Sequence, residues 1–163
     1  MKGLVLTIGA IVAAMSLSYG LASASASSSS ASAGTKVAVA SSKLGRILVD
    51  ARGRTLYLFA KDTSGKSACA GACATYWPPL IASGKPRAGA GAKQSLLGTT
   101  RRADGRLQVT YRHHPLYRYV GDATKGQTKG QGLDLSGGKW WVLSPAGNKI
   151  VKGGSSMGYG YGY

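Results

Sequence analysis

Glutamate is absent from the sequence, and its five acidic side chains are aspartates set against 21 lysines and arginines. Few carboxylates are therefore available to serve as a general acid with a raised pKa. The sequence also contains no nucleophile-elbow serine and no phosphate-loop pattern. These absences favour a non-catalytic domain. A hydrolase that uses Asp62 and Asp122 stays open as an alternative.

Long hydrophobic runs are scarce as well. One uncharged apolar run, Gly3–Leu17, follows Lys2 and precedes Ala-Ser-Ala triplets at 22–24 and 24–26. This run is shorter than the roughly 20 residues that a membrane span needs, and its flanks are typical of a signal peptide. We predict a signal peptide at 1–26, no transmembrane segment after its cleavage, and a protein that is secreted or associated with the cell wall. An uncleaved N-terminal anchor is the alternative.

Cysteine occurs only at Cys69 and Cys73. Two cysteines in an exported protein normally pair, and a spacing of four residues on a helix lies within the reach of a disulfide. The alternative is a soft-metal (copper) or redox site in which the two thiolates act with His113 and His114. The disulfide is the favoured prediction, and no cofactor is expected.

Composition divides the chain into parts. A Ser/Ala-rich spacer is predicted at 27–35, because it has no side chains that could build a core. The folded domain is predicted at 36–151, and a Gly/Tyr-rich mobile tail at 152–163.

An internal repeat dominates the folded part. The stretch TLYLFAKD at 55–62 returns as PLYRYVGD at 115–122. Aligned without a gap, the segments 45–62 and 105–122 share seven identical residues. One supersecondary unit is therefore used twice. The identical pairs are Gly45/Gly105, Arg46/Arg106, Val49/Val109, Arg52/Arg112, Leu56/Leu116, Tyr57/Tyr117 and Asp62/Asp122.

Short alternating runs separated by turns predict a mainly β fold. It consists of two tandem pseudo-repeats, 36–81 and 95–151, each a three-stranded antiparallel meander. A short cysteine-bearing helix is expected after the first meander, over 68–77, because Pro78 follows it. The predicted strands are 36–41, 46–51 and 55–60 in the first repeat, 95–101, 106–111 and 116–120 in the second, and a later one at 139–144.

The strand at 55–60 is apolar on both faces. Leu56 and Leu58 point to one side, and Tyr57 and Phe59 point to the other. Such a strand is expected to be covered on both sides. The aromatic face is predicted to form a core or a groove that the two repeats share.

Aromatic rings among basic side chains suit sugars, bases or acidic polymers. Core packing is the alternative for these rings. Asp62 and Asp122 each close a strand, where an aspartate caps the following turn. Their other interpretation is the carboxylate pair of the hydrolase. The predicted binding residues are Tyr57, Phe59, Tyr117, Tyr119, Arg118 and Trp141.

The two copies Tyr57-x-Phe59-x-x-Asp62 and Tyr117-x-Tyr119-x-x-Asp122 resemble a family of bacterial secreted repeats, or predicted lipoproteins, of unknown function. The segments CAGACATYWPPL, HHPLY and KWWVLSP resemble the family too, so that the likeness covers about 44–151. It implies export and a repeated architecture rather than an activity. The chain departs from the lipoprotein members because no cysteine lies at the predicted cleavage site.

A formal net charge of +16, one unit lower without Lys2, attracts polyanions. The charges are spread along the chain, which indicates a diffuse basic surface and no specific nucleic-acid site. We therefore expect an exported, non-catalytic basic domain that associates with anionic polymers of the cell envelope or the extracellular medium.

Overall fold

The computed structural model describes residues 34–152. The predicted signal peptide, residues 27–33 of the predicted spacer and residues 153–163 of the predicted tail lie outside the described residues. Within 34–152, no helix is long and apolar enough to cross a membrane.

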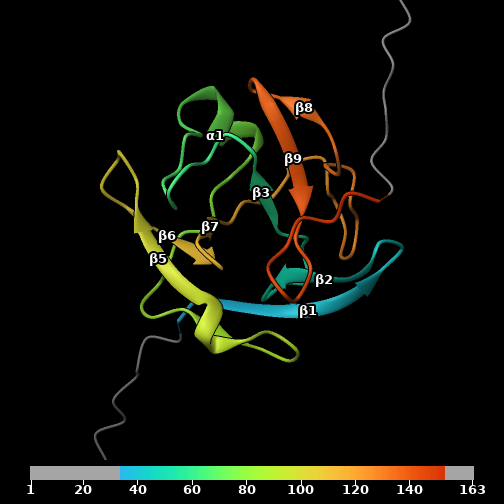
Figure 1. The fold of residues 1–163 in the computed structure, drawn as a ribbon. Helices are drawn as coiled ribbons and strands as arrows, with labels where there is room; N and C mark the ends of the chain where they lie inside the picture. The colour runs from blue at the N-terminus through green and yellow to red at the C-terminus, as the bar shows by residue number, and fades with distance from the viewer. Residues whose placement is uncertain (1–33, 153–163) are drawn as a thin grey trace, which may run out of the picture.

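The fold is mainly β, as predicted, and has three small sheets. The short strand β3, which belongs to one of them, lies near the centre (Figure 1). The sheets have the orders β2-β1-β4, β3-β9-β8 and β5-β6-β7. We count the connector after residue 81 with the first repeat, which then contains β1 (Lys36–Ser42), β2 (Gly45–Asp50), β3 (Tyr57–Phe59), α1 (Ala72–Tyr76) and β4 (Arg87–Ala88). The second contains the 3-10 helix η1 (Gln94–Leu96), β5 (Leu97–Arg101), β6 (Leu107–Tyr111), β7 (His114–Pro115), β8 (Asp134–Leu135) and β9 (Gly138–Val142).

Each repeat begins with an antiparallel hairpin, β1–β2 or β5–β6. The third strand of the first predicted meander touches β2 only at its start, where Thr55 bridges Val49. It then leaves β2, and as β3 it pairs with β9 of the other repeat. The repeats are therefore joined by a sheet that contains strands from both.

The predicted strand at 116–120 is not a regular strand, because its backbone partner changes along its length. The Leu116 N–H donates to the Val109 carbonyl, and the Arg118 N–H donates to the Pro78 carbonyl. Between them, Tyr117 pairs with Tyr57. The segment stays extended while it crosses from β6 to the first repeat.

The ungapped alignment of the repeats is wrong by one residue within the hairpins. The Leu56 N–H donates to the Leu48 carbonyl at 3.0 Å, and the Leu116 N–H donates to the Val109 carbonyl at 3.0 Å. Leu48 is thus equivalent to Val109, although the ungapped alignment pairs Val49 with Val109.

The turn that follows β6 is one residue shorter than the turn that follows β2, and this difference shifts the alignment. In the first repeat, the Gly53 N–H donates to the Asp50 carbonyl, and Gly53 has a φ of 79°. In the second, Tyr111 pairs with His114 around a two-residue turn. Arg112 and His113 both have positive φ there, 48° and 64°, as a type I′ turn requires.

The helix α1 is shorter than the predicted 68–77. Gly71, with a φ of 54°, precedes its first turn, and the helix ends before Pro78. The N–H of Ala68, which belonged to the predicted helix, donates to Oδ1 of Asp62 at 2.8 Å. The first residues of the predicted helix thus form a loop that Asp62 caps.

The strand at 55–60 is covered on both sides, as expected from its two apolar faces. Leu56 and Leu58 belong to an aliphatic cluster with Val37, Val109 and Leu116. Tyr57 and Phe59 belong to a second, aromatic cluster, whose other large members are Trp77, Tyr117 and Trp140. The strand therefore separates two cores.

Candidate functional site

The repeats meet at a backbone pair between the first tyrosines of the two motifs. The Tyr57 N–H donates to the Tyr117 carbonyl at 2.9 Å, and the Tyr117 N–H donates to the Tyr57 carbonyl at 3.0 Å. This reciprocal, antiparallel pair relates the repeats by a pseudo-twofold axis. Residues opposite each other in such a pair have their side chains on the same face.

The tyrosine of each motif binds the aspartate of the other. Tyr57 Oη donates to Oδ2 of Asp122 at 2.6 Å, and Tyr117 Oη donates to Oδ2 of Asp62 at 2.8 Å. The second oxygen of each carboxylate accepts a loop N–H, from Lys129 for Asp122 and from Ala68 for Asp62. Each aspartate thus holds its own loop and the other repeat.

Four aromatic rings form a continuous stack between the repeats, which we call the aromatic stack: Phe59, Trp140, Trp77 and Tyr119. The Trp77 and Trp140 rings lie 3.9 Å apart at the centre and are parallel within 1°. Phe59 stacks on Trp140 at 4.1 Å, and Tyr119 stacks on Trp77 at 4.4 Å. Each end ring therefore packs on the tryptophan of the other repeat.

Burial raises the pKa of both motif aspartates. The pKa of Asp62 reaches about 6, although the Ala68 N–H, the Tyr117 hydroxyl and the Arg102 guanidinium each lower it. For Asp122, burial again outweighs the Tyr57 hydroxyl and the Lys129 N–H. Burial and the facing aspartates also raise the pKa of Tyr57 and Tyr117, so that both phenols stay protonated donors.

Each tyrosine hydroxyl binds the aspartate of the other repeat, which we call the exchange. Removing one of these hydroxyls tests it. We expect Tyr57→Phe to lower the free energy of unfolding by about 1–3 kcal/mol, because Oδ2 of buried Asp122 loses its donor. Chemical denaturation of Tyr57→Phe, Asp122→Asn and the double variant measures the coupling, which should be about 1 kcal/mol. The matched control pairs Tyr57→Phe with Asp62→Asn. If that pair couples as strongly, the exchange does not link the repeats as described.

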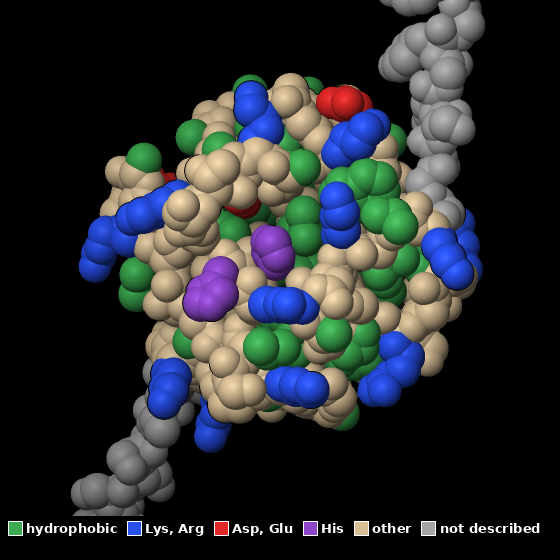
Figure 2. Space-filling model, in the orientation of Figure 1, with side chains coloured by type: hydrophobic (Ala, Val, Ile, Leu, Met, Phe, Trp, Pro, Cys, Tyr) green, Lys and Arg blue, Asp and Glu red, His purple; other side chains and the backbone are tan. Residues whose placement is uncertain are grey.

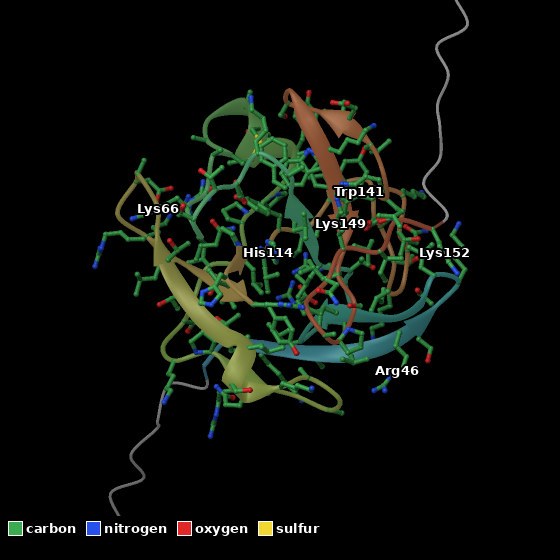
Figure 3. The ribbon with its side chains drawn as sticks, in the orientation of Figure 1. Arg46, Lys66, His114, Trp141, Lys149 and Lys152 are labelled. Atoms are coloured by element: carbon green, nitrogen blue, oxygen red, sulfur yellow. A yellow bond between two sulfur atoms is a disulfide. The ribbon has the colours of Figure 1, made fainter. Side chains whose placement is uncertain are left out.

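The predicted binding residues do not form one surface. Tyr57, Phe59 and Tyr117 are buried, so these rings contribute to the core. Tyr119, Arg118 and Trp141 are partly exposed, and ligand binding stays a prediction for them. Trp141 packs on the aliphatic cluster, and Nζ of Lys149 lies 5.8 Å from its ring centroid (Figure 3). Tyr119 belongs to the other, aromatic cluster.

Cys69 and Cys73 form the predicted disulfide, with their Cα atoms 5.3 Å apart. Both thiols are thereby consumed, which removes the ligands of the alternative metal site. His113 lies in the turn between β6 and β7, and His114 is the first residue of β7. Within 34–152, no group of three or more His, Cys, Asp or Glu side chains could hold a metal ion.

A cationic cavity of about 710 Å³ lies where β1, β4 and the turn between β2 and β3 meet Arg118 of the second repeat. Its charged lining consists of four arginines, one lysine and a single carboxylate, that of Asp50. The cations therefore exceed the acidic groups by four. The cavity is lined by Gly34, Thr35, Lys36, Asp50, Ala51, Arg52, Arg54, Leu80, Arg87, Ala88 and Arg118.

Asp50 organises this cavity. Its Oδ1 accepts the N–H groups of Arg52 and Arg54, which fixes the turn, and its Oδ2 pairs with the Arg54 guanidinium at 2.8 Å. Nη1 of Arg118 lies farther from the same Oδ2 atom, at 3.9 Å. One carboxylate thus partly balances two guanidinium groups.

Arg118 is a partly buried cation of the cavity with an incomplete set of hydrogen-bond partners. Its Nε is buried and has no hydrogen-bond partner among the described residues. Burial lowers the pKa of Arg118, and the nearby charges of Arg54 and Arg52 lower it further against the opposing effect of Asp50. A bound anion would relieve the like charges around this guanidinium.

Sequence reasoning named Arg118 but missed the rest of the cavity. Lys36, Asp50 and Arg87 come from separate elements of the first repeat, and nothing in their local sequence brings them together. One signal was available: Arg118 replaces Leu58 of the first repeat, so a charge enters a position that is apolar in the other copy.

Comparison with known proteins finds two matches of one family along the chain. The model of a family described as a secreted repeat of unknown function matches residues 38–81 and again residues 98–144. The chain belongs to this family. No curated protein and no solved structure matches it. The predicted resemblance and the extracellular location are therefore confirmed.

The two matched segments of this secreted repeat protein contain both halves of the tyrosine–aspartate contacts and of the aromatic stack. The first includes Tyr57, Asp62 and Trp77, and the second includes their partners Asp122 and Tyr117. The repeated unit of the family is thus the part of the chain that builds the pseudo-twofold core, whereas the cavity also uses Gly34, Thr35, Lys36 and Arg87, which lie outside the matched segments.

Proposed function

We propose that this secreted domain binds anionic polymers of the cell envelope or the extracellular medium, and that the cationic cavity holds one charged segment of the polymer. The observation that carries the proposal is a cavity whose lining has an excess of cations, among them the partly exposed Arg118 guanidinium. A phosphate or carboxylate group supplies the acceptor and the negative charge that this lining lacks.

The four arginines favour an oxyanion as the ligand. A guanidinium presents a planar fork that matches the two oxygens of a carboxylate or phosphate, and it stays charged at any physiological pH. Arg52 and Arg87 are exposed at the cavity, so they are accessible to a ligand that reaches Arg118. The proposed ligand is therefore a phosphate or carboxylate group that belongs to a polymer.

The charge of the remaining surface supports a polymer over a small anion. Lys and Arg side chains are spread over the face drawn in Figure 2, where acidic side chains occupy few places. Such a distribution attracts a long polyanion and holds it by many weak, salt-sensitive contacts. The cavity then adds a single specific contact to this diffuse attraction.

Polymer binding by cavity variants tests the proposal. We expect Arg118→Gln and Arg87→Gln each to weaken binding of poly(glycerol phosphate) by about tenfold, because each removes a charged hydrogen-bond donor. Polygalacturonate serves as the carboxylate probe in a second titration. Affinity for both polymers should also fall as salt rises.

The matched control is Arg46→Gln, which removes the same charge from an exposed position outside the cavity lining (Figure 3). It should change the affinity less than twofold, which is the scale of a single screened surface charge. Equal losses for Arg46→Gln and Arg87→Gln would show that only net charge matters. Affinity that is independent of salt would contradict the electrostatic basis of the proposal.

A further inference from the structure

The pseudo-twofold symmetry fails at one edge of the structure. In the first repeat, the outer edge of β1 is covered by β4, which runs parallel to it. The Gly89 N–H donates to the Val37 carbonyl at 2.7 Å, and the Val39 N–H donates to the Ala90 carbonyl at 2.9 Å. The equivalent strand of the second repeat is β5, and it lacks such a cover within residues 34–152.

The hydrogen bonds at the two ends of β5 show which of its backbone groups point outward. The Arg102 N–H donates to the Arg106 carbonyl, and the Arg112 N–H donates to the Leu96 carbonyl, so the even-numbered residues face β6. Thr99 and Arg101 therefore direct their N–H groups away from β6. Among the described residues, these two N–H groups have no backbone partner.

The positions left free on β5 match those covered on β1. Thr99 is paired with Val109 and Val39 with Leu48, so Thr99 is equivalent to Val39. By the same register, Leu97 is equivalent to Val37. The free Thr99 N–H and Leu97 carbonyl thus correspond to the two groups that Ala90 and Gly89 bind on β1.

The course of the chain within residues 34–152 accounts for this difference between the repeats. After Leu80, the first repeat continues to Arg87 and covers β1. After Leu143, which has the equivalent place in the second repeat, the chain turns back on β9. The Ile150 N–H donates to the Val142 carbonyl at 2.9 Å. The segment that would cover β5 is therefore used elsewhere.

A groove of about 380 Å³ lies beside this edge, and its lining includes Leu97, Thr99, Leu107 and Lys85. The cover of β1 indicates the side chains that the position accepts. The cover of β1 consists of small residues, Ala88, Gly89 and Ala90, beside Ala38, whose equivalent on β5 is Gly98. Lys85 in the groove and exposed Arg101 on the strand favour acidic residues between them.

We propose that the outer edge of β5 binds an extended acidic peptide of another protein, with small residues at alternate positions, as a strand parallel to β5. Backbone hydrogen bonds to Leu97, Thr99 and Arg101 hold it, and the groove takes its alternate side chains. A second copy of this chain is disfavoured as the occupant because both copies carry the same strong positive charge.

Amide hydrogen exchange of the full chain, followed by NMR, tests this proposal. The probe is a peptide of about eight residues in which glycine and alanine alternate with aspartate. We expect it to slow exchange of the Thr99 and Arg101 amides by about tenfold or more at saturation, and to leave the already bonded Val39 amide unchanged. Thr99→Pro removes the N–H group that points away from β6, so it should abolish the slowing of exchange by the peptide.

The matched control peptide carries lysine in place of aspartate, and it should give no protection. An equal effect of both peptides, or none from either, overturns the proposal. Slow exchange of Thr99 and Arg101 without peptide also overturns it. In that case, independence of protein concentration identifies another part of this chain as the occupant, and dependence identifies a second copy.

Discussion

Replacing Trp140 with alanine is expected to lower the free energy of unfolding by about 3–5 kcal/mol, the usual cost of emptying a buried tryptophan site. Trp140 is fully buried between the rings of Phe59 and Trp77, and the edge of Tyr117 contacts it as well. Its indole N–H also donates to the Leu135 carbonyl at 3.0 Å. Since small domains are stable by about 5–15 kcal/mol, this change removes a large share of the total.

The adjacent tryptophan provides the control for this experiment. Trp141 lies on the opposite face of β9 and is partly exposed. We expect Trp141→Ala to cost less than half as much, because its ring leaves little enclosed space behind. Urea denaturation followed by circular dichroism measures both variants. Equal losses would mean that the aromatic stack is not the main support of the interface between the repeats.

The stability of the domain is expected to decrease as the pH rises from 4 to 7. The pKa of Asp62 is raised by burial to about 6 in the folded state, so the folded protein binds a proton there that the unfolded chain releases near pH 4. This contribution is complete below pH 4 and is lost as the pH passes 6. We expect a change on the order of 1–2 kcal/mol after allowance for partial exposure.

Two other groups shape this pH profile. The pKa of Asp122 is also raised by burial, so it adds to the same slope. Burial lowers the pKa of His114, which gives a slope of the opposite sign below the ordinary histidine pKa. Denaturant midpoints of Asp62→Asn and His114→Gln between pH 4 and 8 separate the contributions. The slope should flatten in Asp62→Asn and steepen in His114→Gln. An unchanged slope in Asp62→Asn would contradict the assignment.

Much of the local structure was predictable, because it follows from short-range patterns. The alternation of Leu56, Tyr57, Leu58 and Phe59 identified a strand with two covered faces, and the structure confirms both cores. The disulfide followed from the export signal and the cysteine count. The two-repeat architecture followed from the paired motifs.

The relation between the repeats was not predictable from one sequence. Pattern reasoning paired the strand at 55–60 with strands of its own repeat, in a meander, whereas β3 pairs with β9 of the other repeat. The exchange of Tyr57 and Tyr117 between the aspartates depends on a contact across more than fifty residues. A one-residue difference in turn length also hid the true register, because the identical glycines and arginines near 45 and 105 aligned better without a gap.

The candidate site was the least predictable part. Aromatic residues were expected to face a ligand, but burial of apolar area makes the core their more favourable position. The cavity instead gathers basic residues that are dispersed along the chain, from Lys36 to Arg118. Their dispersal, which indicated only a diffuse charge, is what allows the fold to collect them.

The exchange of tyrosine hydroxyls and ring partners has a consequence for how such chains grow. A lone repeat would have a phenol without its acceptor and a tryptophan without its stacking neighbour. It would therefore lack the contacts that stabilise the domain. A relative with a single copy would therefore exist as a homodimer. Gene duplication would lengthen these chains by even numbers of units, since an odd one would remain unfolded or recruit a partner molecule.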